Sequence, residues 1–143
     1  MKTILVIDDE SLLRSSIARA IRSEGYCVAE AKNKAEALEK LKSVGCDLAV
    51  VDLYLEDGMH GMELIREIHQ GNPDVKVIVI TALGTDEVRD ALQREGIDGF
   101  FDKPFEIKEL KKTVECLLNG VKGLSGKTEN REERGDKEKE GFS

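Results

Sequence analysis

The chain has 143 residues, the usual length of one domain, and 36% of them are charged against 40% that are hydrophobic. No apolar run approaches the roughly 18 residues that a transmembrane helix needs, so we predict no membrane-spanning segment. The net charge of -7 repels a phosphate backbone, and we therefore expect no direct nucleic-acid binding.

Short apolar segments alternate with amphipathic ones along the first 120 residues. The first apolar segment ends in acids at residues 8 and 9, too early for a signal peptide, so we expect a cytoplasmic protein. The apolar segments are typical of buried strands, and the expected strands are Thr3–Ile7, Tyr26–Ala29, Asp47–Leu53, Val75–Thr81 and Gly99–Asp102. The amphipathic segments predict helices over Ser11–Glu24, after the capping residue Asn33, over Met62–His69 and Thr85–Glu95, and from Ile107 to Leu118.

The alternation of strands and helices indicates the fold class. Strands that are apolar throughout are buried on both faces, which favours a parallel sheet with helices on each side. In such an α/β fold, ligands bind at the carboxyl ends of the strands. The polar residues at those ends are therefore the candidate functional residues.

Five polar residues end or follow the expected strands, namely Asp8, Asp9, Asp52, Thr81 and Lys103. Because the strands run parallel, we expect these residues to converge on one crevice. Two carboxylates about 4 Å apart repel by roughly 4 kcal/mol at an effective dielectric constant near 20, so the three acids need a compensating cation. An all-oxygen site suits a hard divalent ion such as Mg²⁺.

The segments that carry these residues resemble a known family. They are Ile7-Asp8-Asp9-Glu10, Val51-Asp52-Leu53, Ile80-Thr81-Ala82 and Asp102-Lys103-Pro104-Phe105. In this order and at these separations they resemble the receiver domains of two-component response regulators. The resemblance covers about residues 2 to 120 and implies a flavodoxin-like (βα)5 fold with a central five-stranded parallel sheet in the order 2-1-3-4-5. We expect a receiver domain over residues 1–120 and a charged linker or disordered tail over 121–143.

The resemblance implies a phosphorylation-dependent signalling switch that is not a dedicated enzyme. Asp52 would accept a phosphoryl group from the phosphohistidine of a sensor histidine kinase or a phosphotransfer protein. Asp8 and Asp9 would hold Mg²⁺ together with Asp52 and the backbone carbonyl of Tyr54. Phosphoryl transfer needs positioning and charge neutralisation more than covalent help, which agrees with these roles.

The same resemblance assigns roles to Lys103 and Thr81. Lys103 would pair with Asp52 and then with a phosphoryl oxygen, and Thr81 would bind another phosphoryl oxygen. Thr81 would move on phosphorylation, and Phe100 would enter the space that it leaves. The peptide bond before Pro104 is expected to be cis, which only X-Pro bonds allow at low cost.

The expected fourth helix, Thr85–Glu95, has few apolar residues, so little buried area holds it in place. We therefore expect the signal to leave through this helix, the strand Gly99–Asp102 and the last helix. That face would bind a second copy of the chain or an output partner.

Three other interpretations stay open. A haloacid-dehalogenase-like phosphatase also uses an Asp nucleophile, but it needs a second Asp where this chain has Tyr54. A flavodoxin-like electron carrier needs a first loop rich in Ser, Thr and Gly, whereas residues 8–11 are Asp, Asp, Glu and Ser. A pseudo-receiver without phosphorylation is disfavoured by the intact acids and by Lys103.

Two further features of the sequence lie apart from these motifs. Cys27, Cys46 and Cys116 are far apart and odd in number, so we expect small buried hydrophobic residues and no disulfide or metal knuckle. Glu56 stands where the resembled family usually has Pro, so we expect a more mobile loop after Asp52.

Overall fold

The computed structural model describes residues 1–55, 58 and 60–120, so Glu56 and the charged segment 121–143 lie outside the described residues. The described residues form strands and helices in alternation: β1 (Thr3–Ile7), α1 (Ser11–Arg22), β2 (Cys27–Ala31), α2 (Lys34–Ser43), β3 (Leu48–Asp52), α3 (His60–Gly71), β4 (Lys76–Thr81), α4 (Asp86–Glu95), β5 (Gly99–Asp102) and α5 (Ile107–Asn119). One compact unit, Met1–Lys111, contains β1 to β5 and α1 to α4, and the second unit begins within α5. Among the described residues, no helix combines the length and apolar character needed to cross a bilayer.

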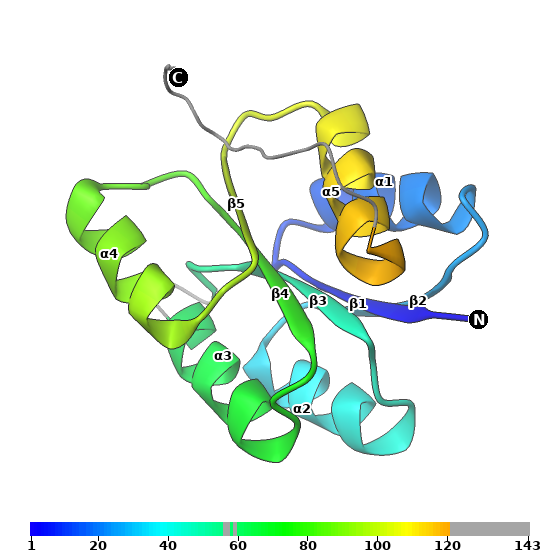
Figure 1. Cartoon of the computed structure of the whole chain (residues 1–143), viewed down its shortest axis with the longest axis horizontal. Coiled ribbons are helices and arrows are strands. Elements are labelled where there is room, and N and C mark those ends of the chain that lie inside the picture. The colour runs from blue at the N-terminus through cyan, green and yellow to red at the C-terminus, as the bar shows by residue number, and fades with distance from the viewer. Residues whose placement is uncertain (56–57, 59, 121–143) are drawn as a thin grey trace. The chain divides into compact units, whose positions relative to one another are not determined.

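The strands form one parallel sheet in the order β2-β1-β3-β4-β5, which confirms the expected fold class (Figure 1). Helices α2, α3 and α4 lie side by side on one face of the sheet, and α1 lies on the other. Because both faces are covered, every residue of β3 is buried. The continuous apolar sequence of this strand follows from that double coverage.

The hydrophobic core shows how alternate residues of one strand serve the two faces. Leu5 and Ile7 of β1 pack in one cluster with Leu64 of α3. Ile4 and Val6 are equally buried, and strand geometry directs them to the opposite face. Each fully buried side chain of this size contributes about 1.5–3 kcal/mol to folding, so the centre of the sheet contributes strongly to the stability of the fold.

Local signals set the ends of the helices. Asn33 caps α2 as predicted, because its side chain accepts a hydrogen bond from the amide of Glu36. Thr85 caps α4 in the same way by accepting from the amide of Val88. Gly96 ends α4 with a φ of 83°, a left-handed conformation that glycine adopts without a steric penalty.

Most predicted boundaries differ from the observed ones by only one or two residues. The largest difference at a strand end is in β2, which is predicted to end at Ala29 and ends at Ala31. Glu30 and Ala31 continue the parallel pairing with Val6 and Ile7. A charged residue weakens the strand pattern, but Glu30 lies in an edge strand and arginines of α1 bind its carboxylate.

The prediction of buried cysteines is wrong for Cys27, which is exposed, and only partly right for Cys46 and Cys116, which are half-buried. Cys27 begins the edge strand β2, and its thiol lies 3.1 Å from the sulfur of Met1. Cys46 precedes β3 and Cys116 lies near the end of α5. These positions are at the ends of elements, where burial is incomplete.

The Lys103–Pro104 peptide bond is cis, as expected.

Gly61 is the point where α3 approaches the loop after β3. Its amide donates to the carbonyl oxygen of Leu53 at 3.0 Å. A Cβ atom at this position would lie 2.5 Å from the carbonyl oxygen of Asp52 and 2.7 Å from the Cα of Leu53. These neighbours are backbone atoms and cannot move aside cheaply, so α3 requires glycine here.

We predict that Gly61→Ala destabilises the protein by about 2 kcal/mol or more, because overpacking against backbone forces α3 away from the sheet. Gly71→Ala is the matched control in the same helix, since a Cβ atom there meets nothing within 4 Å. Alanine's better helix propensity should leave that control unchanged or stabilise it by up to about 1 kcal/mol. Urea denaturation measures both, and equal changes would contradict the close approach at Gly61.

Candidate functional site

The predicted site residues gather at the carboxyl ends of the strands. Asp8 follows β1, Asp52 ends β3, Thr81 ends β4, and Lys103 follows β5. The register of β3 and β4 pairs Asp52 with Ile80, the residue just before Thr81. Residues from four strands therefore meet at one edge of the sheet, as the parallel arrangement requires.

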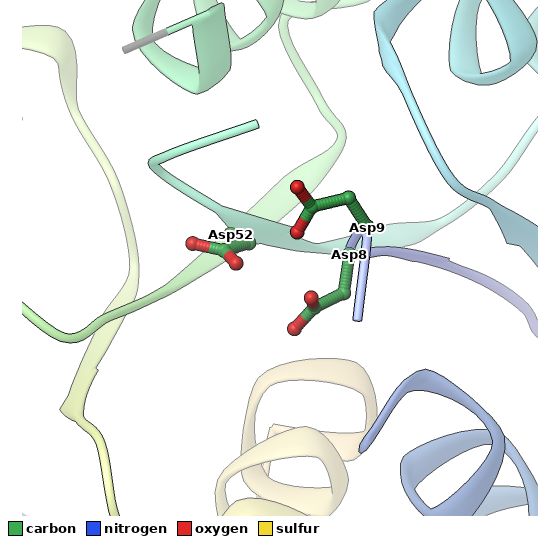
Figure 2. A group of neighbouring side chains, drawn as sticks. All are labelled: Asp8, Asp9 and Asp52. Atoms are coloured by element: carbon green, nitrogen blue, oxygen red, sulfur yellow. The ribbon is translucent and has the colours of Figure 1, made fainter. Parts of the chain in front are cut away.

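The three acids form one cluster between the ends of β1 and β3 (Figure 2). One carboxylate oxygen from each of Asp8, Asp9 and Asp52 lies within 4.8 Å of the other two. Asp8 is fully buried and Asp52 is 4% exposed, whereas Asp9 faces solvent. Buried carboxylates at this separation repel strongly, so they need a positive partner. Three hard oxygen donors, one of them open to water, fit a divalent cation such as Mg²⁺.

Lys103 supplies positive charge to the same place. Its Nζ atom lies 3.1 Å from Oδ2 of Asp52, 3.3 Å from Oδ2 of Asp8 and 3.6 Å from Oε1 of Glu10. Its amide donates to the carbonyl oxygen of Thr81 at 2.8 Å, which continues the pairing of β5 with β4. The ammonium group thus contacts both buried acids, although Lys103 follows the edge strand β5 and the acids lie at the ends of β1 and β3.

The electrostatics of Asp52 reflect a balance of opposed effects. Burial raises the pKa of this carboxyl, the neighbouring carboxylate of Asp8 raises it further, and together they bring it to about 6 although Lys103 and the Tyr54 amide lower it. For Lys103, burial lowers the pKa, but the carboxylates of Asp52 and Asp8 outweigh burial and hold the pKa above its usual value. At neutral pH the site therefore contains an ammonium group and a predominantly ionised Asp52.

Three loops at this edge begin with the same local turn. The Asp8 carboxylate accepts from the Glu10 amide at 2.8 Å, and the Asp52 carboxylate accepts from the Tyr54 amide at 3.1 Å. The Thr81 hydroxyl accepts from the Leu83 amide, also at 3.1 Å. Asp and Thr favour such bonds to the amide two residues ahead. Each bond orients a predicted functional side chain at the point where its strand ends.

Thr81 and Phe100, the predicted switch pair, have different surroundings. Thr81 is fully buried, and Phe100 is half-buried. The Arg89 guanidinium of α4 lies 4.2 Å from the centroid of the Phe100 ring and 2.7 Å from the Asp102 carboxylate. A Cβ atom at Gly84 would lie 2.9 Å from the ring and would collide with the Asp102 carboxylate. Sequence reasoning missed Arg89, because one arginine on a charged helix gives no periodic signal.

The raised pKa of Asp52 generates a prediction for the metal-free protein. The unfolded carboxyl titrates near 3.8 and the folded one near 6, so the folded state loses stability as the pH rises through this range. A pKa shift of about two units lowers the free energy of unfolding by about 3 kcal/mol at most. We expect Asp52→Asn to raise the melting temperature at pH 7.5, with a gain that shrinks towards pH 4.

Thermal melts without divalent ions measure this difference. Asp90→Asn, at an exposed position of α4, is the control and should leave the melting temperature almost unchanged at both pH values. A lower melting temperature for Asp52→Asn at pH 7.5 would show that the Lys103 contact outweighs burial and repulsion.

Comparisons with known proteins agree on one family. Residues 4–115 match the model of the response regulator receiver domain. The chain is 32% identical over 121 residues to the two-component response regulator PhoP of Pseudomonas aeruginosa, covering 85% of this chain and 53% of that protein. It is 36% identical over 115 residues to response regulator RR06 of Streptococcus pneumoniae, covering 80% and 52%. The chain thus spans about half the length of these relatives.

Solved structures show the same likeness. A CheY-like receiver domain protein from Methanospirillum hungatei is 29% identical with a TM-score of 0.79, covering 84% of this chain and 95% of that one. A response regulator from Burkholderia pseudomallei is 26% identical with a TM-score of 0.72, covering 85% and 74%. The latter structure contains a phosphorylated aspartic acid, a calcium ion and citrate.

Proposed function

Because the chain belongs to the response regulator receiver domain family, we propose that its phosphorylation-dependent signalling operates through a phosphoryl group on Asp52. The observation that carries this proposal is the Asp52 carboxylate itself, which is buried beside Asp8 and paired with Lys103. The donor would be the phosphohistidine of a sensor histidine kinase or of a phosphotransfer protein. The chain would promote its own modification and its reversal, without acting on other substrates.

The geometry of Asp52 suits a nucleophile. Its Oδ1 atom accepts from the Tyr54 amide, and its Oδ2 atom lies against the Lys103 ammonium. In the transfer, a carboxylate oxygen would form a bond to phosphorus while the bond from phosphorus to the histidine nitrogen breaks. A carboxylate held at both oxygens is oriented before the donor arrives, which lowers the entropic part of the barrier.

Asp8, Asp9 and Asp52 would hold Mg²⁺, with the backbone carbonyl of Tyr54 as a further ligand. The bound ion would supply neutralisation of the charge on the transferring phosphoryl oxygens. The cluster of acids supports this assignment, since one oxygen from each lies within common reach of the others. The calcium ion and phosphorylated aspartic acid in the Burkholderia pseudomallei structure agree with it.

Lys103 and Thr81 would stabilise the phosphorylated state. The Lys103 ammonium would remain paired with the modified Asp52 and would contact a phosphoryl oxygen. The Thr81 hydroxyl accepts from the Leu83 amide, so its own proton is available to donate to another phosphoryl oxygen. Hydrogen bonds to charged oxygens are stronger than neutral ones, so the phosphoryl group would draw Thr81 towards itself.

We predict that a small phosphodonor or beryllofluoride with Mg²⁺ modifies the chain once, and that Asp52→Asn abolishes this modification. Intact-mass measurement of both proteins is the test. Asp90→Asn, which removes an exposed carboxylate of α4, should be modified like the wild type. Equal modification of wild type and Asp52→Asn would disprove the assignment, and no modification of either would favour a pseudo-receiver.

We propose that the signal leaves through the face formed by α4, β5 and α5, which would bind a second copy or an output partner. Of the residues of α4, Leu92 is the one that is buried, so the helix is weakly attached. Arg89 connects α4 to β5 through both Phe100 and Asp102. Movement of Thr81 next to this connection would change how α4 lies against β5.

Hydrogen exchange with and without beryllofluoride tests this face. We expect the changes to concentrate in residues 81–110 and around Asp52. Arg89→Ala removes the ring contact and the ion pair, so amides of α4 should exchange faster even before beryllofluoride is added. Changes that appear mainly in α1 would contradict the proposed output face.

We also propose that the receiver domain comprises residues 1–120 and that 121–143 form a charged linker or tail. The family match ends at residue 115, and α5 ends at Asn119. The segment 121–143 lies outside the described residues, so its composition alone supports this division.

A further inference from the structure

Arg14, near the start of α1, connects the end of β1 to the edge strand β2. One guanidinium nitrogen donates to the carbonyl oxygen of Asp8 at 2.8 Å. The Nε atom donates to Oε1 of Glu30 at 3.2 Å. The Arg14 side chain is only 17% exposed, so these two bonds are shielded from competing water. A planar guanidinium group with two fixed partners holds both in one geometry.

Glu30 is itself held from a second side. Arg22, near the end of α1, places a guanidinium nitrogen 3.4 Å from Oε2 of Glu30 and 3.1 Å from the carbonyl oxygen of Val28. The carboxylate of Glu30 therefore lies between two arginines of the same helix. Of these two arginines, Arg14 bonds to the backbone of the acidic cluster, while Arg22 bonds to the backbone of β2.

We propose that Arg14 is a positioning residue for the cation-binding carboxylates. This inference rests on the proposed function of the site. The carbonyl that Arg14 binds belongs to the peptide unit that joins Asp8 to Asp9, and this unit is planar. Holding its oxygen fixes the plane, and with it the directions in which the two side chains leave the backbone.

The Asp8 carboxylate also accepts from the Glu10 amide, and the Asp9 carboxylate lies at the surface. Both side chains leave the backbone from the two ends of the peptide unit that Arg14 holds. Groups that orient metal ligands from outside the ligand set often change metal affinity by tenfold or more. Arg14 lies in α1 and contributes no ligand itself, but it orients both Asp8 and Asp9 from outside the ligand set.

Electrostatics and positioning make opposite predictions for the loss of Arg14. A guanidinium group next to the acidic cluster repels a divalent cation, so removing its charge alone would strengthen Mg²⁺ binding. If Arg14 positions the ligands, its removal weakens binding instead. The sign of the change in affinity therefore separates the two roles.

The test compares the wild-type chain of 143 residues with Arg14→Met and Arg22→Met, which keep a long apolar side chain but lose the guanidinium group. Isothermal titration calorimetry with Mg²⁺, carried out well below the melting temperature, gives the dissociation constant. We expect Arg14→Met to raise the dissociation constant about tenfold, as for other outer-shell ligand supports. Arg22→Met, which also loses a contact with Glu30, should stay within about twofold because it leaves the Asp8 carbonyl bonded.

A second measurement separates positioning from a general loss of structure. At saturating Mg²⁺, Arg14→Met should reach the same extent of beryllofluoride modification at Asp52 as the wild type, as measured by intact mass. Arg14→Lys, which keeps the charge but has a point-like ammonium head, should bind Mg²⁺ with an affinity between wild type and Arg14→Met. This variant also serves if Arg14→Met fails to fold.

The inference is overturned if Arg14→Met binds Mg²⁺ as tightly as the wild type or more tightly. It is also overturned if Arg14→Lys matches the wild type, or if Arg14→Met is modified less at saturating Mg²⁺. Absence of Mg²⁺ binding by the wild type would instead refute the proposed cation site, and the inference with it.

Discussion

The contact between the Lys103 ammonium and the carboxylates of Asp52 and Asp8 is the interaction on which the site depends. These two acids are almost completely buried, and without a positive partner their charges would repel each other strongly. Lys103 balances part of this charge, yet the pKa of Asp52 stays near 6. The acidic cluster therefore keeps a net demand for positive charge, and this demand favours a divalent cation at the same place.

The sheet makes this arrangement possible because it holds the ends of parallel strands at one edge. The hydrophobic core fixes the strands, and the turns that begin at Asp8, Asp52 and Thr81 then orient the polar side chains. Membership of the receiver family removes the support for a haloacid-dehalogenase-like phosphatase or a flavodoxin-like electron carrier. Such a phosphatase needs a second acid two residues after its nucleophile. This chain has Tyr54 there, and the backbone amide of Tyr54 donates to the Asp52 carboxylate.

The region around α4 contrasts with this rigid edge. One side chain of α4, Leu92, is fully buried, and Val88 and Ala91 are partly buried against the core. At the surface, Arg89 contacts Phe100 and Asp102, and Glu95 pairs with Arg66 of α3. Exposed ion pairs contribute little stability, and a cation–π contact at a half-exposed ring adds about 0.5–1 kcal/mol. The surface contacts of α4 therefore add little to the stability that its few buried side chains provide. This limited attachment is the reason for proposing α4 as part of the output face, since a weakly held element can be shifted by one phosphoryl group.

The succession of strands and helices along the chain could be predicted from the amino-acid sequence, because apolar periodicity reports directly which residues are buried. The sequence also predicted that the three acids and Lys103 meet, since polar residues at the ends of parallel strands share one edge. The contacts of charged surface residues, such as Arg14 with Glu30 and Arg89 with Phe100, could be found only in the folded chain. For a charged side chain on a helix surface, a sequence pattern predicts only that it is exposed to solvent. Its partner is chosen by the packing of elements far apart in the chain, which local sequence does not encode.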